Sequence, residues 1–552
     1  MDKLRIIPLG GLEQVGINMM AYEFGNDIIV VDMGVGFPGE VITGVQYLIP
    51  NPEWLERPEN KKRIRGVVIT HGHMDHIGAM PYILPRLGFP PVYSMPLTIG
   101  LVKRRLEEFD LAEQPRFIPF GADDTLKLGN FTLRFFRVNH SIPDAVGLSI
   151  NTPAGQVIHT GDWKLDHTPG DDFKAELGKL ARFAGEGVLA LLSDSTNARI
   201  PGYSLSEQDI AKTIDKVFDE ADGRIIFTCN ALILTRIQQM LHAAAKHQRK
   251  VAVFGYSMVK NIDVAISLGY LKVAPGLIIK PEQLRKHGDK NVVILTTGGQ
   301  GELLAGLPRM ARGEHRNVRL KRGDTAVVSA RAIPGNERPM QEMIANLHKL
   351  NVHVIYSQMV DIHSSGHARQ IELKLMLDLV KPRYFIPVHG EHHMLAAHKQ
   401  LAESIDFPSK NIFLLNNGSI LELGANGARV LQETVPAGYL FVNESGAGAV
   451  SEEVRGERRQ MQDEGMVTIV IPHDAKSGKI GPLNILSRGF VYVKSNEHLF
   501  RELRHELEKT LGGGSANRDG KHLEAVVADR AAEYLLQKTG RSPFIAPVVI
   551  EV

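Results

Sequence analysis

A short polar string near residue 70 carries the densest group of metal-binding side chains in the sequence. It follows an apolar run, GVVIT at 66–70, and places four potential ligands within six residues: His71, His73, Asp75 and His76. Imidazole and carboxylate groups bind zinc and related cations. His71 and His73 are expected on one side of a tight loop and Asp75 and His76 on another, which begins two metal sites. A loop with coincidental histidines is the alternative, but burying three imidazoles and a carboxylate without a cation would be costly.

Three further strings, each at the end of an apolar run, offer side chains that could complete such sites. They are VNHS with His140, HTGD with Asp162 and PVHGE with His389. Any one of them alone would more often be a structural residue than a ligand. Together with the first string they favour a metal centre, because Asp162 can bridge two cations while His140 and His389 close opposite ends. The single cysteine, Cys229, leaves histidine and carboxylate to carry any metal chemistry.

These strings must be positioned by strands, since α/β sheets place their sites at strand ends. Short apolar runs alternate with helix-like stretches along the first 440 residues, which predicts an α/β architecture. The segment 207–350 has a complete strand and helix alternation of its own between the histidine strings, so we expect an inserted domain there. The domain that carries the strings would comprise 1–206 and 351–440, followed by a charged linker at 441–465 and a C-terminal α+β domain at 466–552.

Composition indicates a folded protein and excludes several classes. A chain of 552 residues is expected to form two or three domains, and 43% hydrophobic with 23% charged residues argues against long disorder or a coiled-coil rod. The net charge is only +2, so a nucleic-acid surface would have to concentrate its charge in a groove. A basic cluster such as KRR at 103–105 is usually a solvated face, but one that lines a cleft would hold phosphates in a salt-dependent way.

The compartment is also bounded by the sequence. No window approaches the roughly 20 apolar residues of a membrane helix, and the start shows no apolar signal segment. A single cysteine fits a reducing environment. We therefore expect a cytoplasmic protein with no membrane partner.

The order of the candidate ligands, HxHxDH followed by His, Asp and His, resembles the metallo-β-lactamase superfamily. The resemblance implies an αββα sandwich with two Zn²⁺ ions, for which Mn²⁺ or Mg²⁺ could substitute. It implies two ligand groups that share one carboxylate: His71, His73 and His140 for one ion, Asp75, His76 and His389 for the other, and Asp162 between them. Two such cations lower the pKa of a shared water and stabilise an in-line displacement at phosphorus.

Two other strings, SDST at 193–196 and HSSGHA at 363–368, resemble those of the beta-CASP nuclease branch of the superfamily. There the inserted domain covers the metal cleft. The resemblance implies that Asp194 supports the metal ligands by hydrogen bonding and that His367 stands close to the scissile phosphate, where a histidine can protonate the departing ribose oxygen. On the residues alone, Asp194 could equally cap a helix, and His367 could be a surface-loop histidine.

Nearly the whole chain, about residues 5–552, resembles the ribonuclease J family. The resemblance is carried by several strings in the family's order: PLGGLEQVGINM at 8–19, GDWKLDHTP at 161–169, SDSTNA at 193–198, SARAIPGNE at 329–337, SGHA at 365–368, PVHGE at 387–391 and GPLNILSRGFVYV at 481–493. It implies a cytoplasmic two-zinc ribonuclease that degrades single-stranded RNA from a 5′-monophosphate end and can also cut internally. It also implies a homodimer or homotetramer and a place in RNA-processing assemblies.

Some positions depart from the usual family pattern. Met74 occupies a variable place in HxHxDH that is not a ligand, so metal binding should survive. Tyr256, in GYSM, stands where the family often has arginine, the natural bidentate partner of phosphate. A tyrosine could instead stack on a base. The other matched candidates for holding the 5′-phosphate and its nucleotide are Ser329, Ser365, Gly366, His367 and Asn336.

The expected function is a zinc-dependent ribonuclease acting in RNA processing and decay. Its predicted catalytic residues are Asp75, Asp162, Asp194 and His367, and 5′→3′ exonuclease action is favoured over purely internal cutting. Three alternatives stay open on the sequence. They are an endonuclease only, a small-molecule ester or thioester hydrolase, and a catalytically weak RNA-binding scaffold.

Overall fold

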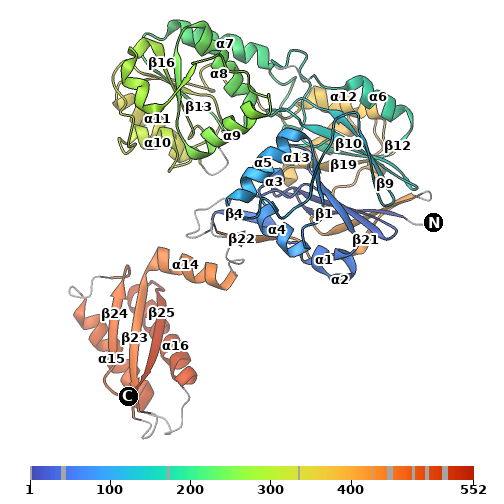
Figure 1. The fold of residues 1–552 in the computed structure, drawn as a ribbon. Helices are drawn as coiled ribbons and strands as arrows, with labels where there is room; N and C mark the ends of the chain where they lie inside the picture. Colours follow the sequence, from blue (N-terminus) through green and yellow to red (C-terminus); the bar gives the residue numbers. More distant parts are fainter. Residues whose placement is uncertain are drawn as a thin grey trace. The chain divides into compact units, whose positions relative to one another are not determined.

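The protein is described from a computed structural model, which covers residues 3–38, 45–170, 174–332, 336–424, 427–443, 452–474, 479–491, 496–512 and 520–552. The chain forms two compact units (Figure 1). One comprises Met1–Gly39 with Tyr47–Leu440, and the other Glu40–Gln46 with Phe441–Val552. Within the described ranges, no helix has the length and apolar character needed to cross a bilayer.

Two facing sheets form the core of the first unit. The first sheet has the strand order β21 (Gly427–Thr434), β20 (Ser419–Gly424), β1 (Leu4–Gly10), β2 (Met19–Phe24), β3 (Asp27–Val31), β5 (Ile64–Val68), β6 (Val92–Ser94) and β7 (Phe117–Pro119). The second has the order β19 (Tyr384–Val388), β12 (Val188–Asp194), β11 (Gly155–His159), β10 (Val146–Thr152), β9 (Phe131–Arg137) and β8 (Thr125–Leu128). Buried residues of both sheets, such as Ile6 and Leu192, form one apolar cluster, so the two sheets pack face to face.

Helices cover the outer faces of this sandwich. On the second sheet, α6 (Leu177–Gly185), α12 (Gln370–Val380) and α13 (His392–Glu403) bury apolar residues against strand residues such as Leu191 and Phe385. On the first sheet, α5 (Pro96–Glu107) packs on β6 and β7. The remaining short elements of this layer are α1 (Glu53–Glu56), α2 (Pro58–Lys61), α3 (Met74–Ile77), α4 (Met80–Leu87), β4 (Tyr47–Pro50), a 3₁₀ turn at Ser409–Asn411 and β22 (Tyr439–Val442). The expected αββα sandwich is confirmed.

A parallel sheet is inserted in the chain between β12 and β19. Its order is β15 (Ile278–Ile279), β14 (Lys250–Val253), β16 (Val292–Thr296), β13 (Ile225–Thr228), β17 (Thr325–Val328) and β18 (His353–Tyr356). Its helices are α7 (Glu207–Glu220), α8 (Leu234–Lys246), α9 (Tyr256–Ser267), α10 (Gly306–Ala311) and α11 (Glu337–Lys349), with 3₁₀ turns at Pro281–Lys286 and Asp289–Asn291. The five residues of β16 are all buried, as expected for a parallel strand covered on both faces. This sheet begins and ends close to the expected insert at 207–350, whose limits stay predictions.

The second unit is a small α+β fold. Three strands lie in the order β24 (Asn484–Arg488), β23 (Met466–His473) and β25 (Phe544–Glu551), with β23 antiparallel to β24 and parallel to β25. Leucines of α15 (Glu497–Gly512) and apolar residues of α16 (Gly520–Thr539) share one core with the sheet. The expected linker at 441–465 contains a helix, α14 (Glu452–Glu464), while its residues 444–451 lie outside the described ranges.

Candidate metal centre

Strand ends of both sheets bring the sequence-predicted ligands to one place. His71 and His73 lie in the loop after β5, and the short helix α3 carries Asp75 and His76. The others follow strands of the second sheet: His140 after β9, Asp162 after β11 and His389 directly after β19. Their ligand atoms fall into groups whose members lie within 4.8 Å of one another, the first being His71, His73 and His140, the second Asp75, His76, Asp162 and His389. All seven predicted ligands are therefore brought together.

The first group consists of three imidazoles that face one another. Nδ1 of His73 lies 3.1 Å from Nε2 of His71 and 2.9 Å from Nε2 of His140. Burial lowers the pKa of His73 to about 4 and lowers the pKa of the other two imidazoles well below the usual value. Neutral imidazoles present lone pairs, and three nitrogens this close cannot all be satisfied by sharing protons. A cation between them would satisfy all three.

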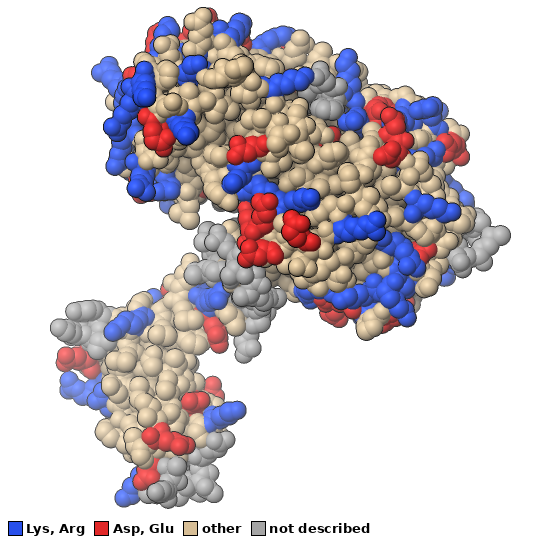
Figure 2. Space-filling view, in the orientation of Figure 1, with Lys and Arg blue, Asp and Glu red and all other residues tan. Residues whose placement is uncertain are grey.

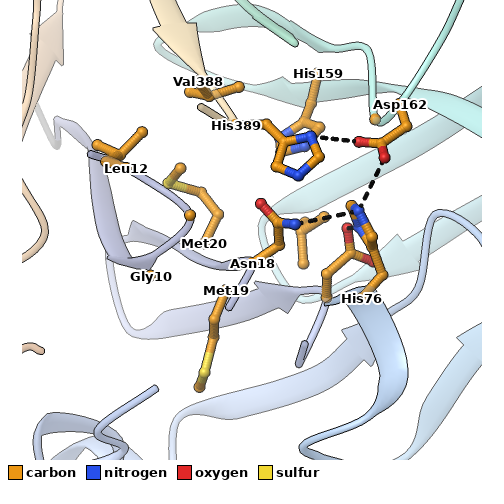
Figure 3. A pocket seen from close by; sticks show the side chains of 14 residues that line it. Gly10, Leu12, Asn18, Met19, Met20, His76, His159, Asp162, Val388 and His389 are labelled. Carbon is orange, nitrogen blue, oxygen red and sulfur yellow. Dashed lines mark hydrogen bonds and ion pairs between the residues drawn. The ribbon is translucent and has the colours of Figure 1, made fainter. Parts of the chain in front are cut away.

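The second group is built around Asp162, as Figure 3 shows. One carboxylate oxygen, Oδ1, lies 3.0 Å from Nδ1 of His389, and the other, Oδ2, lies 3.2 Å from Nε2 of His76. Nε2 of His71 and of His140 lie 3.7 and 3.8 Å from the same Oδ2. A single buried carboxylate thus touches histidines of both groups.

The charges of this group require compensation. Burial alone would lower the pKa of His76 and His389, but the Asp162 carboxylate raises both well above the usual value. Each buried carboxylate therefore stabilises the positive charge of the neighbouring imidazoles, and the imidazoles stabilise its negative charge. Within the described part of the chain, Nε2 of His389 is buried without a hydrogen-bond partner, and it lies 3.5 Å from Oδ2 of Asp75. An unsatisfied imidazole nitrogen beside two carboxylates fits a metal ligand, so the residues present fit cations of the zinc type.

Residues outside the ligand set fix the orientation of these histidines. Nδ1 of His76 donates to Oδ2 of Asp32 at 2.7 Å, and Nδ1 of His140 donates to the carbonyl of Gly366 at 2.8 Å. Each bond leaves Nε2 free to face the cluster. Asp32 also accepts from the amide and the hydroxyl of Thr70, at 2.8 and 2.9 Å.

Asp194 and His367 form a pair beside Asp162. Nδ1 of His367 donates to Oδ2 of Asp194 at 2.7 Å, and the other oxygen of Asp194 accepts from the amide and hydroxyl of Thr196. The helix that follows, α7, is capped by Ser206 instead, so Asp194 is not its N-cap. The ring of His367 lies edge-on to that of His140 and tilted to that of His389, with centroids 5.2 and 5.5 Å away, so it is not a surface-loop histidine.

The structure divides the predicted substrate-binding residues into two sets. Ser365 accepts from Nδ2 of Asn197 at 2.9 Å, and Gly366 contacts His140, so both lie at the cluster with His367. Ser329 is fully buried and donates to the carbonyl of Ile362 at 2.5 Å.

The remaining two predicted substrate-binding residues, Tyr256 and Asn336, lie at the starts of helices that flank the inserted sheet. Tyr256 opens α9 with 71% of its surface exposed, and Asn336 precedes α11. Among the described residues, neither has a hydrogen bond or ring contact with the ligand cluster.

Sequence reasoning did not identify Asp32, Asn18 or Tyr22. Nδ2 of Asn18 donates to the carbonyl of Asp75 and lies 3.2 Å from Nε2 of His76. The Tyr22 hydroxyl lies 2.7 Å from Nδ1 of His159, beneath the cluster. In the sequence, the only signal for Asp32 was a lone carboxylate at the end of the apolar run 28–31. In the structure, its backbone has a φ of 63°.

Comparison with known proteins agrees with this architecture along the chain. The profile of a beta-lactamase superfamily domain matches residues 29–183, and that of a Zn-dependent metallo-hydrolase RNA specificity domain matches 352–414. Between and after them, profiles of the ribonuclease J beta-CASP domain and the ribonuclease J C-terminal domain match 222–347 and 454–552.

Full-length relatives decide the family. The chain is 39% identical to ribonuclease J 1 of Streptococcus pyogenes, over 100% of this chain and 98% of that protein. It is 41% identical to ribonuclease J of Thermus thermophilus, over 100% and 96%, and 34% identical to ribonuclease J2 of Bacillus subtilis, over 100% and 99%. The chain belongs to the ribonuclease J family. A solved protein of unknown function from Enterococcus faecalis shares the fold, with a TM-score of 0.54 and 16% identity over 76% of this chain and all of that one.

Membership of the ribonuclease J family confirms three predictions made from the sequence: the family itself, the metallo-β-lactamase fold with its beta-CASP insert and C-terminal domain, and a metal-dependent nuclease as the class of enzyme.

Asp32→Asn should weaken metal binding, because the neutral amide side chain would accept from His76 without the full negative charge of the carboxylate. We expect zinc affinity to fall by about 10- to 100-fold. The measurement is zinc content after dialysis against graded chelator, with Asp219→Asn on the exposed face of α7 as the matched control. Equal zinc retention in both variants would contradict the role of Asp32.

Gly34→Ala should displace α3 and with it two ligands. A Cβ at residue 34 would lie 1.5 Å from the carbonyl oxygen of Asp75, so backbone must move. We expect a loss of about 1–3 kcal/mol in the free energy of unfolding together with a lower zinc content. Gly178→Ala in α6, where a Cβ meets nothing within 4 Å, is the control and should retain both properties. Thermal melting and metal analysis decide the outcome.

Proposed function

We propose that the protein is a 5′→3′ exoribonuclease that acts on 5′-monophosphorylated single-stranded RNA and also cuts internally, using two Zn²⁺ ions. The observation that carries this proposal is the position of Asp162. Its carboxylate contacts His76 and His389 of one ligand group, and its Oδ2 lies 3.7 and 3.8 Å from Nε2 of His71 and His140 of the other. The same carboxylate lies 3.9 Å from Nδ1 of His367. One carboxylate shared by two groups of nitrogen ligands suits a two-cation site for phosphodiester hydrolysis.

The proposed ligands are the residues that converge in the structure: His71, His73 and His140 for one ion, Asp75, His76 and His389 for the other, and Asp162 for both. Zinc is the first choice because the ligands are mostly imidazoles, and Mn²⁺ could replace it. When bound, the pair supplies water activation and stabilises negative charge that develops on the phosphate. Asp32 and Gly366 hold His76 and His140 in the tautomers that present Nε2.

His367 is proposed to donate a proton to the departing 3′ oxygen of the ribose, so that the product carries a 5′-phosphate. Its Nδ1 is held by Asp194, which leaves Nε2 as the proton-donating atom. Burial would lower the pKa of His367, but the charges of Asp194 and Asp162 raise it above the usual value. This direction favours the protonated imidazole that a general acid requires.

Recognition of the RNA end is proposed for the loop that carries Ser365, Gly366 and His367, because this loop lies at the ligand cluster. Tyr256 is proposed to stack on a base, since its ring is exposed on the inserted sheet's side. Ser329 and Asn336 would act less directly. Ser329 holds the backbone at Ile362, just before the same loop, and Asn336 precedes α11.

The setting proposed for this activity is RNA processing and decay in the cytoplasm, by a homodimer or homotetramer within RNA-processing assemblies. Family membership supports it, and the lone cysteine, Cys229, is buried as a free thiol, which suits a reducing compartment.

A 5′-end assay tests the proposal. Purified protein with Zn²⁺ or Mn²⁺ is given single-stranded RNA labelled at its 5′ end, as monophosphate, triphosphate or hydroxyl. We expect labelled mononucleotide from the monophosphate RNA alone. Asp162→Ala should abolish its release, because the carboxylate shared by both ligand groups is lost.

Other products would identify the alternatives. Internal fragments that form whatever the 5′ group would mean an endonuclease only. Binding of RNA without cleavage by zinc-loaded protein would indicate a scaffold. Hydrolysis of an ester or thioester with no action on nucleic acid would indicate a small-molecule hydrolase.

Asp194→Asn should move the alkaline limb of the pH profile of kcat to lower pH. The Asp194 charge raises the pKa of His367, so its removal lowers that pKa, and the acid form is lost earlier as pH rises. The measurement is kcat on monophosphate RNA between about pH 5 and 9, with Asp219→Asn as control. An unchanged limb in a variant that keeps its zinc would rule out His367 as the acid under control of Asp194.

A further inference from the structure

A cleft of about 310 Å³ opens beside the helix that carries Asp75 and His76. On the sandwich side it is lined by residues of α3 and α5, and on the side of the inserted sheet by residues of α9 and of the loop after β13. Its lining includes Met74 and Ile77 of α3, Arg104 of α5, and Ser257 and Asn261 of α9. Because Met74 directly precedes the ligand Asp75, one end of the cleft adjoins the metal centre.

Arg104, like its neighbour Arg105, lies in the lining with buried donors that are not used. Only 8% of its surface is exposed, and its Nη1 donates to Oε1 of Glu108 at 2.9 Å. Its Nε and Nη2 are buried and have no hydrogen-bond partner among the residues that the structure describes. Leaving charged donors buried and unpaired is energetically unfavourable. The unpaired N–H groups of Arg104 are therefore available to donate to a ligand that enters the cleft.

The two unused atoms define the ligand's chemistry. Nε and Nη2 form the edge of the guanidinium whose parallel N–H groups match two oxygens of a phosphate or carboxylate. Arg104 and Arg105 both pair with Glu108, so two positive charges on α5 meet one negative charge. An anion with two coplanar oxygens fits this edge.

Tyr256 lies over the same guanidinium. The Cζ of Arg104 is 5.3 Å from the centroid of the Tyr256 ring, while the tyrosine itself is 71% exposed. A ring exposed on one side and seated on a cation on the other can move to uncover the cation, and it offers a face to a nucleobase. An arginine for a phosphate and an aromatic ring for a base are together what a single-stranded nucleic acid requires.

We propose that Arg104 binds a backbone phosphate of single-stranded RNA as the strand passes through this cleft, with Tyr256 against the adjoining base. This inference rests on the proposed function. The ligand is an internal phosphodiester and not the 5′-phosphate, because the RNA end is proposed to bind the loop with Ser365, Gly366 and His367, and none of these residues lines this cleft. Figure 2 shows basic and acidic side chains interspersed on the face drawn there.

The test compares full-length, zinc-loaded wild type with Arg104→Gln, Arg104→Lys and the control Arg86→Gln, which breaks an ion pair between α4 and Glu56. Binding of a nuclease-resistant 2′-O-methyl RNA, with a 5′-monophosphate or a 5′-hydroxyl, is measured by fluorescence anisotropy over a series of salt concentrations. Steady-state cleavage of ordinary RNA is measured in parallel. Thermal melting and zinc content report folding.

For Arg104→Gln we expect Kd and KM to rise by about tenfold or more for both 5′ ends, since a charge-assisted bidentate contact is lost. The salt slope of log K should fall by about 0.7, the value for one phosphate contact on a single strand. Because the contact is made equally before and during reaction, kcat should stay within about twofold. Arg104→Lys should restore the salt slope but only part of the affinity, because it keeps the charge and loses the fork.

Several results would overturn the inference. They are equal affinity of Arg104→Gln and Arg86→Gln, a loss confined to monophosphate RNA, or a loss of affinity with an unchanged salt slope, which would indicate packing alone. If Arg104→Gln does not fold, the test is Arg104→Lys. An RNA affinity of Arg104→Lys equal to that of wild type would rule out a bidentate contact of the guanidinium with phosphate. If wild type cleaves RNA and Arg104→Gln binds RNA as well as Arg86→Gln does, only the proposed role of Arg104 is wrong. If wild type binds no RNA, the proposed function is wrong as well.

Discussion

The buried carboxylate of Asp162 is the constraint on which the rest of the site depends. It contacts His76 and His389 directly and lies within 4 Å of His71, His140 and His367. A negative charge at 2% exposure is tolerated only when it is compensated, and here the compensation comes from cations or from protonated imidazoles. The same need for compensation that would destabilise an ordinary core makes this position suitable for a cation ligand.

The sandwich meets that constraint because its strand ends converge. Asp162 and His389 follow strands of one sheet, while His71 to His76 follow β5 of the other, so only a face-to-face packing brings them into contact. The inserted sheet does not disturb this arrangement. β12 and β19 pair in parallel with Asp194 opposite Val388, which places Asp194 next to His389 although the whole insert separates them in sequence. Loop-closure entropy grows only slowly with the length of an excursion, so the pairing can tolerate it.

The sequence predicted the parts of the site whose chemistry is local. The ligand strings could be identified because histidines and carboxylates cluster at the ends of apolar runs, and all seven converge. Asp32 could not be identified, because one carboxylate after a strand has no partner in the sequence. Ser329 matched a family string, but its full burial depends on packing around Ile362. The charged segment expected as a linker contains α14. Its Glu, Arg and Gln residues have high helix propensity, but in the sequence the same residues are also typical of an exposed linker.

Arg104 shows most clearly how packing changes the meaning of a sequence pattern. In KRR at 103–105 it belongs to a cluster that would ordinarily be solvated. The approach of α5 to α9 decides otherwise: a Cβ on Gly100 would lie 2.9 Å from Val264, so only glycine lets the two helices come this close one turn before Arg104. The close approach buries the guanidinium under Tyr256. Two of the proposed metal ligands lie on α3 and the others follow β5, β9, β11 and β19, whereas this arginine lies on α5. Residues of α9 that face α5 can therefore change the proposed contact with RNA without moving the ligands.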